Sequence, residues 1–243
     1  MIVTETRPTT IAGTPDVRPF ATLGAANHGW LDARHHFSFA NYYNPARMGW
    51  GSIRVWNDDR IAAKSGFPPH PHADMEIITY VRTGAITHAD SLGNKGRTEA
   101  GDVQVMSAGS GVRHAEYNLE GEETTIFQIW VEPRARGGAP FWGAKPFPRH
   151  ARDGRWSVLA SGFGEADALP LRADARVLGA TLPSGATLTH EVAAGRHAYL
   201  VPATGAIEID GVPASARDGV ALAEGRYTIT ATEDAELVLV DAA

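Results

Sequence analysis

The sequence predicts an all-β protein made of two antiparallel β-barrels in tandem. Helical periodicity is weak almost throughout, whereas short β-branched or alternating segments recur between clusters of glycine, proline, asparagine and aspartate. The 26 glycines and 15 prolines of the 243-residue chain punctuate these segments at a spacing typical of sandwiches and barrels. Apolar residues make up 43% of the chain, which is enough for the cores of two ordinary domains.

The expected strands form two groups that repeat one another. They cover residues 53–56, 76–81, 103–106, 125–131, 206–209, 227–230 and 236–240. Thr-Gly-Ala-Ile at residues 83–86 recurs at 204–207, each time after an apolar strand that contains tyrosine. Segment 101–109 is likewise echoed by segment 218–225. This self-similarity indicates a duplicated barrel unit.

A break between the two units is expected where Arg-Ala-Arg-Gly-Gly-Ala-Pro and Lys-Pro-Phe-Pro interrupt any regular element. The sequence therefore predicts a first domain of residues 1–133, a linker of residues 134–150 and a second domain of residues 151–243. Because such a pair of barrels is self-contained, we expect a monomer.

Charge and cysteine content exclude several classes of protein. Acidic residues outnumber basic ones by 28 to 22 and no lysine or arginine run offers a footprint for phosphates, so direct nucleic-acid binding is not expected. Without cysteine, the chain has neither disulfides nor thiolate ligands. We see no signal-peptide pattern at the start and no apolar run of membrane-spanning length, so we expect a cytoplasmic protein that does not bind membranes.

Imidazole and carboxylate side chains gather in two short segments of the first half. His70 and His72 are followed by Glu76, and His114 is followed by Glu116. Residues two apart on a strand share a face, and these ligand types suit iron, manganese, nickel, copper or zinc. Two hairpins facing each other across a small barrel can bring such pairs to about 2.0–2.2 Å from one ion. The sequence therefore predicts a metal site.

The second half lacks this ligand set. Counted from the shared segments, its counterparts are His190 and Val192 (or, one place earlier, Thr189 and Glu191) for the first pair, and Thr230 and Thr232 for the second. We therefore expect one metal ion, bound in the first half.

The ligand segments resemble a known superfamily. Residues 66–76, Gly-Phe-Pro-Pro-His-Pro-His-Ala-Asp-Met-Glu, resemble the first cupin motif, and residues 101–118 resemble the second. More narrowly, the His-Pro-His-x-x-x-Glu pattern, His-Ala-Asp-Ser-x-Gly-Asn at 88–94 and His-Ala-Glu at 114–116 resemble the pirin family. The resemblance implies two cupin barrels in tandem (a bicupin), the second of them degenerate.

The segments at residues 27–32 and 37–43 are similar to short bacterial pirin-like proteins known as quercetin 2,3-dioxygenases. Over residues 25–133 the resemblance is specific, and beyond them it is only architectural. It implies that O2 opens the central ring of a flavonol substrate and that carbon monoxide is released. Iron is the favoured metal, with manganese, nickel, copper, cobalt or zinc as alternatives.

Two carboxylates compete for the metal. In many cupins the glutamate four residues after the second histidine is a ligand, which carries over to Glu76, and the parity of residues 70, 72 and 76 leaves this open. The pirin pattern instead carries over to His70, His72, His114 and Glu116. We expect Glu116 to bind the metal and to act as the base that deprotonates the substrate. Glu76 is then a supporting group or part of the pocket wall.

Other functions fit the same ligand set. A non-enzymatic regulator would bind metal and act through a protein partner, because one scaffold hosts many functions. A different cupin reaction, such as isomerisation or another ring cleavage, is a third hypothesis.

Two further groups of residues stand out in the first half. The aromatic and imidazole side chains between Trp30 and Tyr43 are expected to pack in a core or between domains rather than to roof the pocket. A hairpin loop is expected to hold His88, Asp90 and Asn94.

Overall fold

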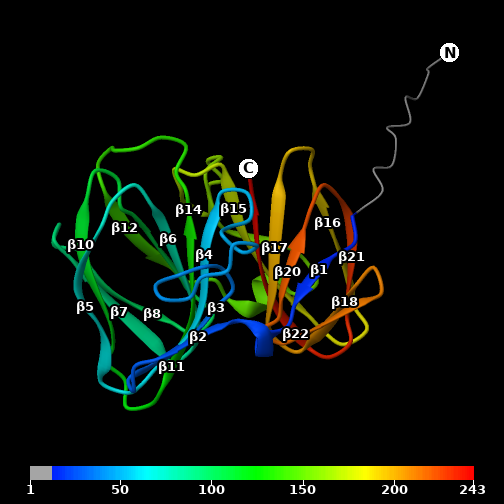
Figure 1. The fold of residues 1–243 in the computed structure, drawn as a ribbon, viewed down its shortest axis with the longest axis horizontal. Helices are drawn as coiled ribbons and strands as arrows, with labels where there is room; N and C mark the ends of the chain where they lie inside the picture. The colour runs from blue at the N-terminus through cyan, green and yellow to red at the C-terminus, as the bar shows by residue number, and fades with distance from the viewer. Residues whose placement is uncertain (1–12) are drawn as a thin grey trace.

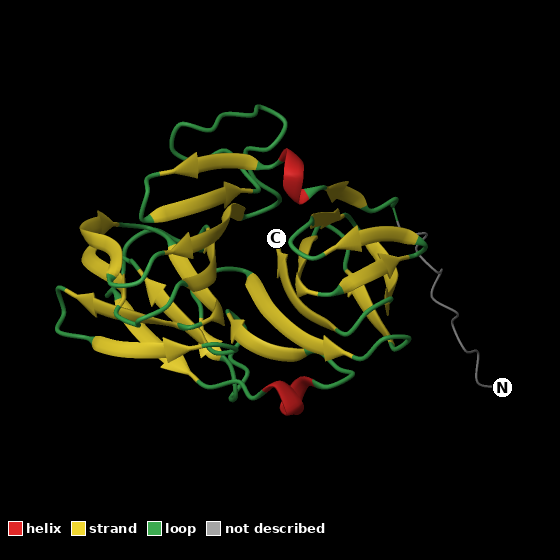
Figure 2. Cartoon of the chain, turned by 90° about the horizontal axis from the view of Figure 1, so that it is seen from below, coloured by secondary structure: helices red, strands yellow, loops and turns green. Residues whose placement is uncertain are grey.

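The structure is a computed structural model that describes residues 13–243. Within these residues strands dominate, and the helical elements are two short 3-10 helices, η1 (Phe20–Thr22) and η2 (Arg149–Arg152) (Figure 2). None of the helices in the described part is long and apolar enough to cross a membrane. Two barrels lie side by side (Figure 1). The predicted all-β fold of two barrels is confirmed.

The first barrel combines a seven-stranded sheet with a four-stranded sheet. The order of the larger sheet is β12 (Phe141–Lys145), β9 (Val103–Ser107), β6 (Glu76–Thr83), β11 (Thr124–Val131), β4 (Ile53–Ile61), β3 (Leu31–His35) and β2 (Gly24–Asn27). The order of the smaller sheet is β5 (Ser65–His72), β10 (Val112–Asn118), β7 (Ala85–Asp90) and β8 (Lys95–Glu99).

The second barrel repeats this arrangement. Its larger sheet has the order β1 (Asp16–Arg18), β20 (Gly219–Leu222), β17 (His197–Thr204), β22 (Ala235–Ala242), β15 (Ala175–Leu182), β13 (Ser157–Ser161) and β14 (Leu169–Pro170). Its smaller sheet has the order β16 (Thr187–Val192), β21 (Gly225–Ala231), β18 (Ala206–Ile209) and β19 (Val212–Ser215).

Two strands lie where the sequence pattern does not place them. β1 comes from the start of the chain but pairs with β20, so it lies beside the strands of the second barrel (blue in Figure 1). β12 lies inside the segment 134–150 that was expected to be a linker, and it pairs with β9 at the edge of the first barrel. Both strands depend on pairing with distant segments.

The repeat in the sequence extends to the strand register. In the first barrel the register between β6 and β11 slips by one residue next to Thr83. In the second barrel the register between β17 and β22 slips in the same way next to Thr204. Because both threonines open the Thr-Gly-Ala-Ile repeat, equivalent positions of the two barrels can be counted from them.

Alternate residues of the larger sheet of the first barrel face opposite sides. On β6, Ile78 and Tyr80 belong to an apolar cluster that includes residues of both barrels. Their neighbours Ile77 and Val81 belong instead to smaller clusters inside the first barrel. The interior of this barrel is therefore reached by odd-numbered residues of β6, and the junction between the barrels by even-numbered ones.

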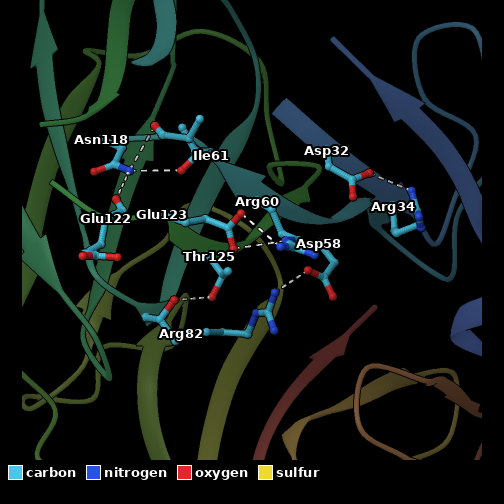
Figure 3. Close-up of polar contacts among 12 residues, drawn as sticks. Asp32, Arg34, Asp58, Arg60, Ile61, Arg82, Asn118, Glu122, Glu123 and Thr125 are labelled. Atoms are coloured by element: carbon cyan, nitrogen blue, oxygen red, sulfur yellow. Dashed lines mark hydrogen bonds and ion pairs between the residues drawn. The ribbon is translucent and has the colours of Figure 1, made fainter. Parts of the chain in front are cut away.

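Polar contacts hold the strands that carry the site. The side-chain amide of Asn118, at the end of β10, donates hydrogen bonds to the carbonyl oxygens of Ile61 at 3.0 Å and Glu122 at 2.8 Å (Figure 3). The buried carboxylate of Asp58 on β4 pairs with Arg82 of β6, also drawn in Figure 3, and with Arg217 of the second barrel. Both the loop after β10 and the junction are thereby tied to β4.

Candidate metal centre

His70 and His72 lie on β5, the edge strand of the smaller sheet. Within residues 13–243 its one sheet neighbour is β10, and the three prolines of the strand, which have no N–H to donate, are tolerated at such an edge. His70 pairs with His114 and Phe67 pairs with Glu116, so β5 carries one extra residue between these pairs. On the other side of this bulge His70 lies directly opposite His114, so the two ligand pairs meet across β5 and β10.

The three histidines converge at one point. Ring nitrogens of His70, His72 and His114 all lie within 4.8 Å of one another. The Nε2 atoms of His70 and His114 are 3.1 Å apart. Metal–nitrogen bonds of about 2.1 Å would place neighbouring ligand nitrogens about 3.0–3.4 Å apart. The donor set therefore fits a single transition-metal ion.

The imidazoles are prepared to act as neutral ligands. The Nδ1 atom of His70 lies 2.8 Å from the carbonyl oxygen of Pro68, so the N–H donated there leaves Nε2 free. Burial, reinforced by the other two histidines, lowers the pKa of His72 to about 4. Burial and the neighbouring His70 and His88 lower the pKa of His114 to about 3. Neutral imidazole is the form that binds metal.

Glu116 supplies a carboxylate to the same region. It follows His114 on β10, and its ligand oxygen lies with ring nitrogens of His88 and His114 in a second group within 4.8 Å. Three side chains of the larger sheet donate hydrogen bonds to this buried carboxylate: Thr79 at 3.2 Å, Gln104 at 2.6 Å and Gln128 at 2.7 Å. These donors hold the carboxylate in one orientation.

Glu76 faces the junction between the barrels. Asp74, with a left-handed φ of 52°, separates β5 from β6, so the equal parity of residues 70, 72 and 76 does not put them on one strand face. The Ser107 hydroxyl donates to the Glu76 carboxylate at 2.6 Å, and the backbone N–H of Arg172, from the second half of the chain, donates at 2.9 Å. Neither metal-competent group includes Glu76.

A cavity of about 340 Å³ opens beside the histidines. Aromatic rings and prolines form most of its wall, which consists of Phe39, Phe67, Pro68, Pro69, His70, His72, Gln128 and Trp130. A second cavity of about 390 Å³ shares Phe39 and Trp130, whose rings meet edge to face at 5.4 Å. Few polar groups in a mostly apolar wall are typical of a site for a small organic ligand.

The aromatic segment of residues 30–43 serves both roles that the sequence suggests. Phe37 is fully buried in the junction, with its ring 4.9 Å from that of Tyr199. Phe39, by contrast, lines the cavity beside the histidines, and Tyr42 lines the adjoining one. The expected packing role is therefore only part of its contribution.

Sequence reasoning missed His88 as a member of the site. The expected turn is present, because the Asp90 carboxylate accepts the backbone N–H groups of Leu92 and Asn94. His88 itself, however, lies inside β7, is fully buried and belongs to the group with His114 and Glu116. The i, i+2 spacing of residues 88 and 90 before the turn was the available signal.

Comparison with known proteins agrees with this geometry. The family model described as Pirin matches residues 16–131, and the one described as Quercetinase C-terminal cupin domain matches residues 158–242. A pirin-like protein of Caulobacter vibrioides is 67% identical over 230 residues, covering 94% of this chain and 99% of the relative. The chain belongs to the pirin family. The resemblance seen in the motifs is thereby confirmed, as are the two cupin domains.

Two further relatives are named for an activity or for a bound metal. A protein named quercetin 2,3-dioxygenase from Escherichia coli is 42% identical over 220 residues, which is 90% of this chain and 94% of the relative. The crystal structure of the Escherichia coli pirin YhhW in complex with nickel(II) superposes with a TM-score of 0.88 at 40% identity. That alignment covers 94% of this chain and 98% of YhhW.

Proposed function

We propose that this pirin is a metal-dependent dioxygenase that uses O2 to open the central ring of a flavonol such as quercetin, with release of carbon monoxide. The observation that carries the proposal is a group of three imidazoles, His70, His72 and His114, beside an aromatic-lined cavity, with the Glu116 carboxylate in an adjoining group that shares His114. The quercetin 2,3-dioxygenase name of the Escherichia coli relative supports the same reaction.

The proposed metal ligands are His70, His72, His114 and Glu116. Iron is the favoured ion, and manganese, cobalt, nickel, copper and zinc suit the same donors. The nickel complex of the related pirin supports a divalent transition metal. When bound, such an ion supplies a Lewis acid with open positions for substrate and dioxygen. Glu76 is not among the proposed ligands, because its carboxylate is bonded across the junction.

The cavity is the proposed binding site for the flat flavonol. The rings of Phe39, Phe67 and Trp130 offer apolar surfaces against which an aromatic substrate can stack. Gln128 lines the same cavity and donates a hydrogen bond to Glu116, so a single side chain connects the substrate site with the carboxylate. These walls would also exclude bulk water from the reacting oxygens.

Glu116 is the proposed acceptor of the flavonol hydroxyl proton. Its carboxylate is grouped with ring nitrogens of His88 and His114, and its donors hold it in a fixed position. A base held near the hydroxyl of a bound flavonol would generate the electron-rich anion that reacts with dioxygen.

The test is oxygen uptake and carbon monoxide release with quercetin, measured on protein reconstituted in turn with each of the six metals. We expect turnover with at least one metal and its loss in His70→Ala. The proposal is wrong if every metal-loaded form of the wild type behaves like His70→Ala and consumes neither O2 nor quercetin. Binding of a protein partner without any turnover would instead support the regulator hypothesis.

A further inference from the structure

The inner face of the smaller sheet carries four polar side chains in a square. In the pairing of β10 with β7, Glu116 lies directly opposite His88, and His114 lies directly opposite Asp90. Residues two apart on one strand share a face, so all four side chains point into the barrel. His88 and Asp90 have no part in the proposed function so far.

Hydrogen bonds connect three of these residues in a line. The Nε2 atom of His88 lies 3.1 Å from a carboxylate oxygen of Asp90, and its Nδ1 atom lies 3.4 Å from Nδ1 of His114. The other ring nitrogen of His114, Nε2, is the one that faces His70 at 3.1 Å. The line therefore ends at the proposed metal position.

The Asp90 carboxylate decides which ring nitrogens of His88 and His114 donate and which accept, because a carboxylate only accepts hydrogen bonds. The oxygens of Asp90 accept hydrogen bonds from Leu92 and Asn94, so the carboxylate also acts as acceptor for His88 Nε2–H. A neutral imidazole with its proton on Nε2 has a lone pair on Nδ1. His88 Nδ1 then accepts from His114 Nδ1–H, which leaves a lone pair on Nε2 of His114, where a metal would bind.

The ring of His88 is held in this orientation. It is fully buried and stacks on Trp142 of β12, with ring centres 4.8 Å apart and planes inclined by 8°. Gly96, which pairs with His88, makes room for the tryptophan, because a Cβ atom there would lie 2.2 Å from the indole ring. The edge strand β12 thereby holds the ring of His88, the middle residue of the line, in place.

We propose that Asp90 and His88 are positioning residues that set the tautomer and orientation of His114 for metal binding. This inference rests on the proposed metal site. Groups that orient a ligating histidine typically contribute about 10–100-fold to metal affinity. His88 is not proposed as a ligand, because its Nε2 is bonded to Asp90 and its Nδ1 faces the nitrogen of His114 that points away from His70.

The test compares His88→Asn with His88→Leu, two side chains of nearly equal shape. The Asn oxygen can occupy the position of Nδ1 and accept the hydrogen bond from His114, whereas Leu cannot. Nickel(II) affinity is measured by competition with a chelator, and the imidazole tautomers of the metal-free protein are measured by nitrogen NMR. We expect the proton of His114 on Nδ1 in the wild type and in His88→Asn.

In His88→Leu we expect loss of that single tautomer and nickel affinity lower by about 10–100-fold, with His88→Asn within a few-fold of the wild type. Equal affinity in wild type and His88→Leu would overturn the positioning role while leaving the metal site intact. An equal loss in both variants would also overturn it and would make His88 a ligand. A wild-type chain that binds no nickel would overturn the metal site itself, and this inference with it.

Discussion

The two barrels of this pirin share their strand register but differ in what fills the interior. In the first barrel Thr79 of β6 pairs with Gln128 of β11, and apolar clusters lie on either side of them along both strands. Counted from the register slip, their counterparts in the second barrel are Leu200 and Leu239, which also pair. These belong to one continuous apolar core.

The smaller sheets show the same contrast at the ligand positions. His70 pairs with His114 in the first barrel, and the equivalent pair in the second is His190 with Tyr227. The strand pairing puts Val192, Ile229 and Ile209 at the positions of His72, Glu116 and His88. The expected counterparts Thr230 and Thr232 were three residues too far along, because strand pairing rather than distance from a shared glycine defines equivalence.

The same barrel fold can therefore hold either a cluster of polar side chains or an apolar core in its interior. Burying imidazoles and a carboxylate costs stability unless each is hydrogen-bonded or bound to metal, whereas the leucine and isoleucine layer of the second barrel stabilises it directly. His190, which occupies the position of His70, bonds to Asp241 at 3.2 Å instead of facing other imidazoles. The first barrel thus holds buried polar groups in its interior, whereas the interior of the second is an apolar core.

The largest difference between the barrels should appear in metal binding. Replacing His70 by alanine removes a proposed ligand, whereas the same change at its counterpart His190 does not. We expect His70→Ala to lower nickel affinity by more than about 100-fold, beyond the effect of losing a group that only supports a ligand. Calorimetric titration of both variants checks this, and equal losses would remove the distinction between the barrels.

Stability should show the opposite asymmetry. Leu239→Ala opens a hole in the apolar core of the second barrel and should lower the free energy of unfolding by about 2–5 kcal/mol. At the equivalent position Gln128→Ala leaves one oxygen of Glu116 without its donor, which should cost about 1–3 kcal/mol. Urea denaturation of the metal-free proteins measures both. A larger loss in Gln128→Ala would contradict the assignment of the second barrel as the more stabilising one.

Substituting the two buried glutamates distinguishes the proposed metal site, which contains Glu116, from the junction, which contains Glu76. Glu116→Gln keeps the size of the side chain but removes the charge from the imidazole cluster, so nickel affinity should fall by at least about 10-fold. Glu76→Gln acts on the other face of the sheet and should leave nickel affinity unchanged. Nickel affinities of both variants are measured by competition titration. A loss in Glu76→Gln with none in Glu116→Gln would make Glu76 the ligand.

The smallest effect expected is the part of the pH dependence of stability that comes from His36 in the junction. Burial, with Arg18 close by, lowers the pKa of His36 well below its ordinary value. Below about pH 6.5 the unfolded chain therefore binds a proton that the folded chain excludes, so stability is lost as the pH falls, by up to about 1.4 kcal/mol per pH unit.

In His36→Asn the oxygen can still accept from the Tyr199 hydroxyl, which lies 2.9 Å from His36 Nδ1, but no group titrates. The slope of unfolding free energy against pH between 6.5 and 5 should therefore decrease by the share of His36, while His72 and His114, whose pKa values are also lowered, keep the rest of it. An unchanged slope would mean that His36 contributes nothing and that the acid sensitivity comes from other groups such as His72 and His114.

Much of the fold can be predicted from the sequence because its signals are local. Alternating strands, turn residues and the Thr-Gly-Ala-Ile repeat identify two barrels, and the motifs single out His70, His72, His114 and Glu116. β1 and β12 escape such reasoning, because their pairing with β20 and β9 depends on distant segments.

The remainder of the site depends on register. Gln104 and Gln128 reach Glu116 only because β9 and β11 bring them across the barrel, and polar residues in strands give no sign of this. The orientation of Glu76 depends on the turn at Asp74. His88 enters the site because β7 pairs with β10 in one particular register.

The most direct test of the single-site claim is anomalous diffraction from crystals of the nickel-loaded protein. We predict one nickel peak per chain, bonded to His70, His72, His114 and Glu116 in the first barrel, with none beside His190. A peak in the second barrel, or a first-barrel ion that lacks Glu116 or binds His88 or Glu76 in its place, would contradict it.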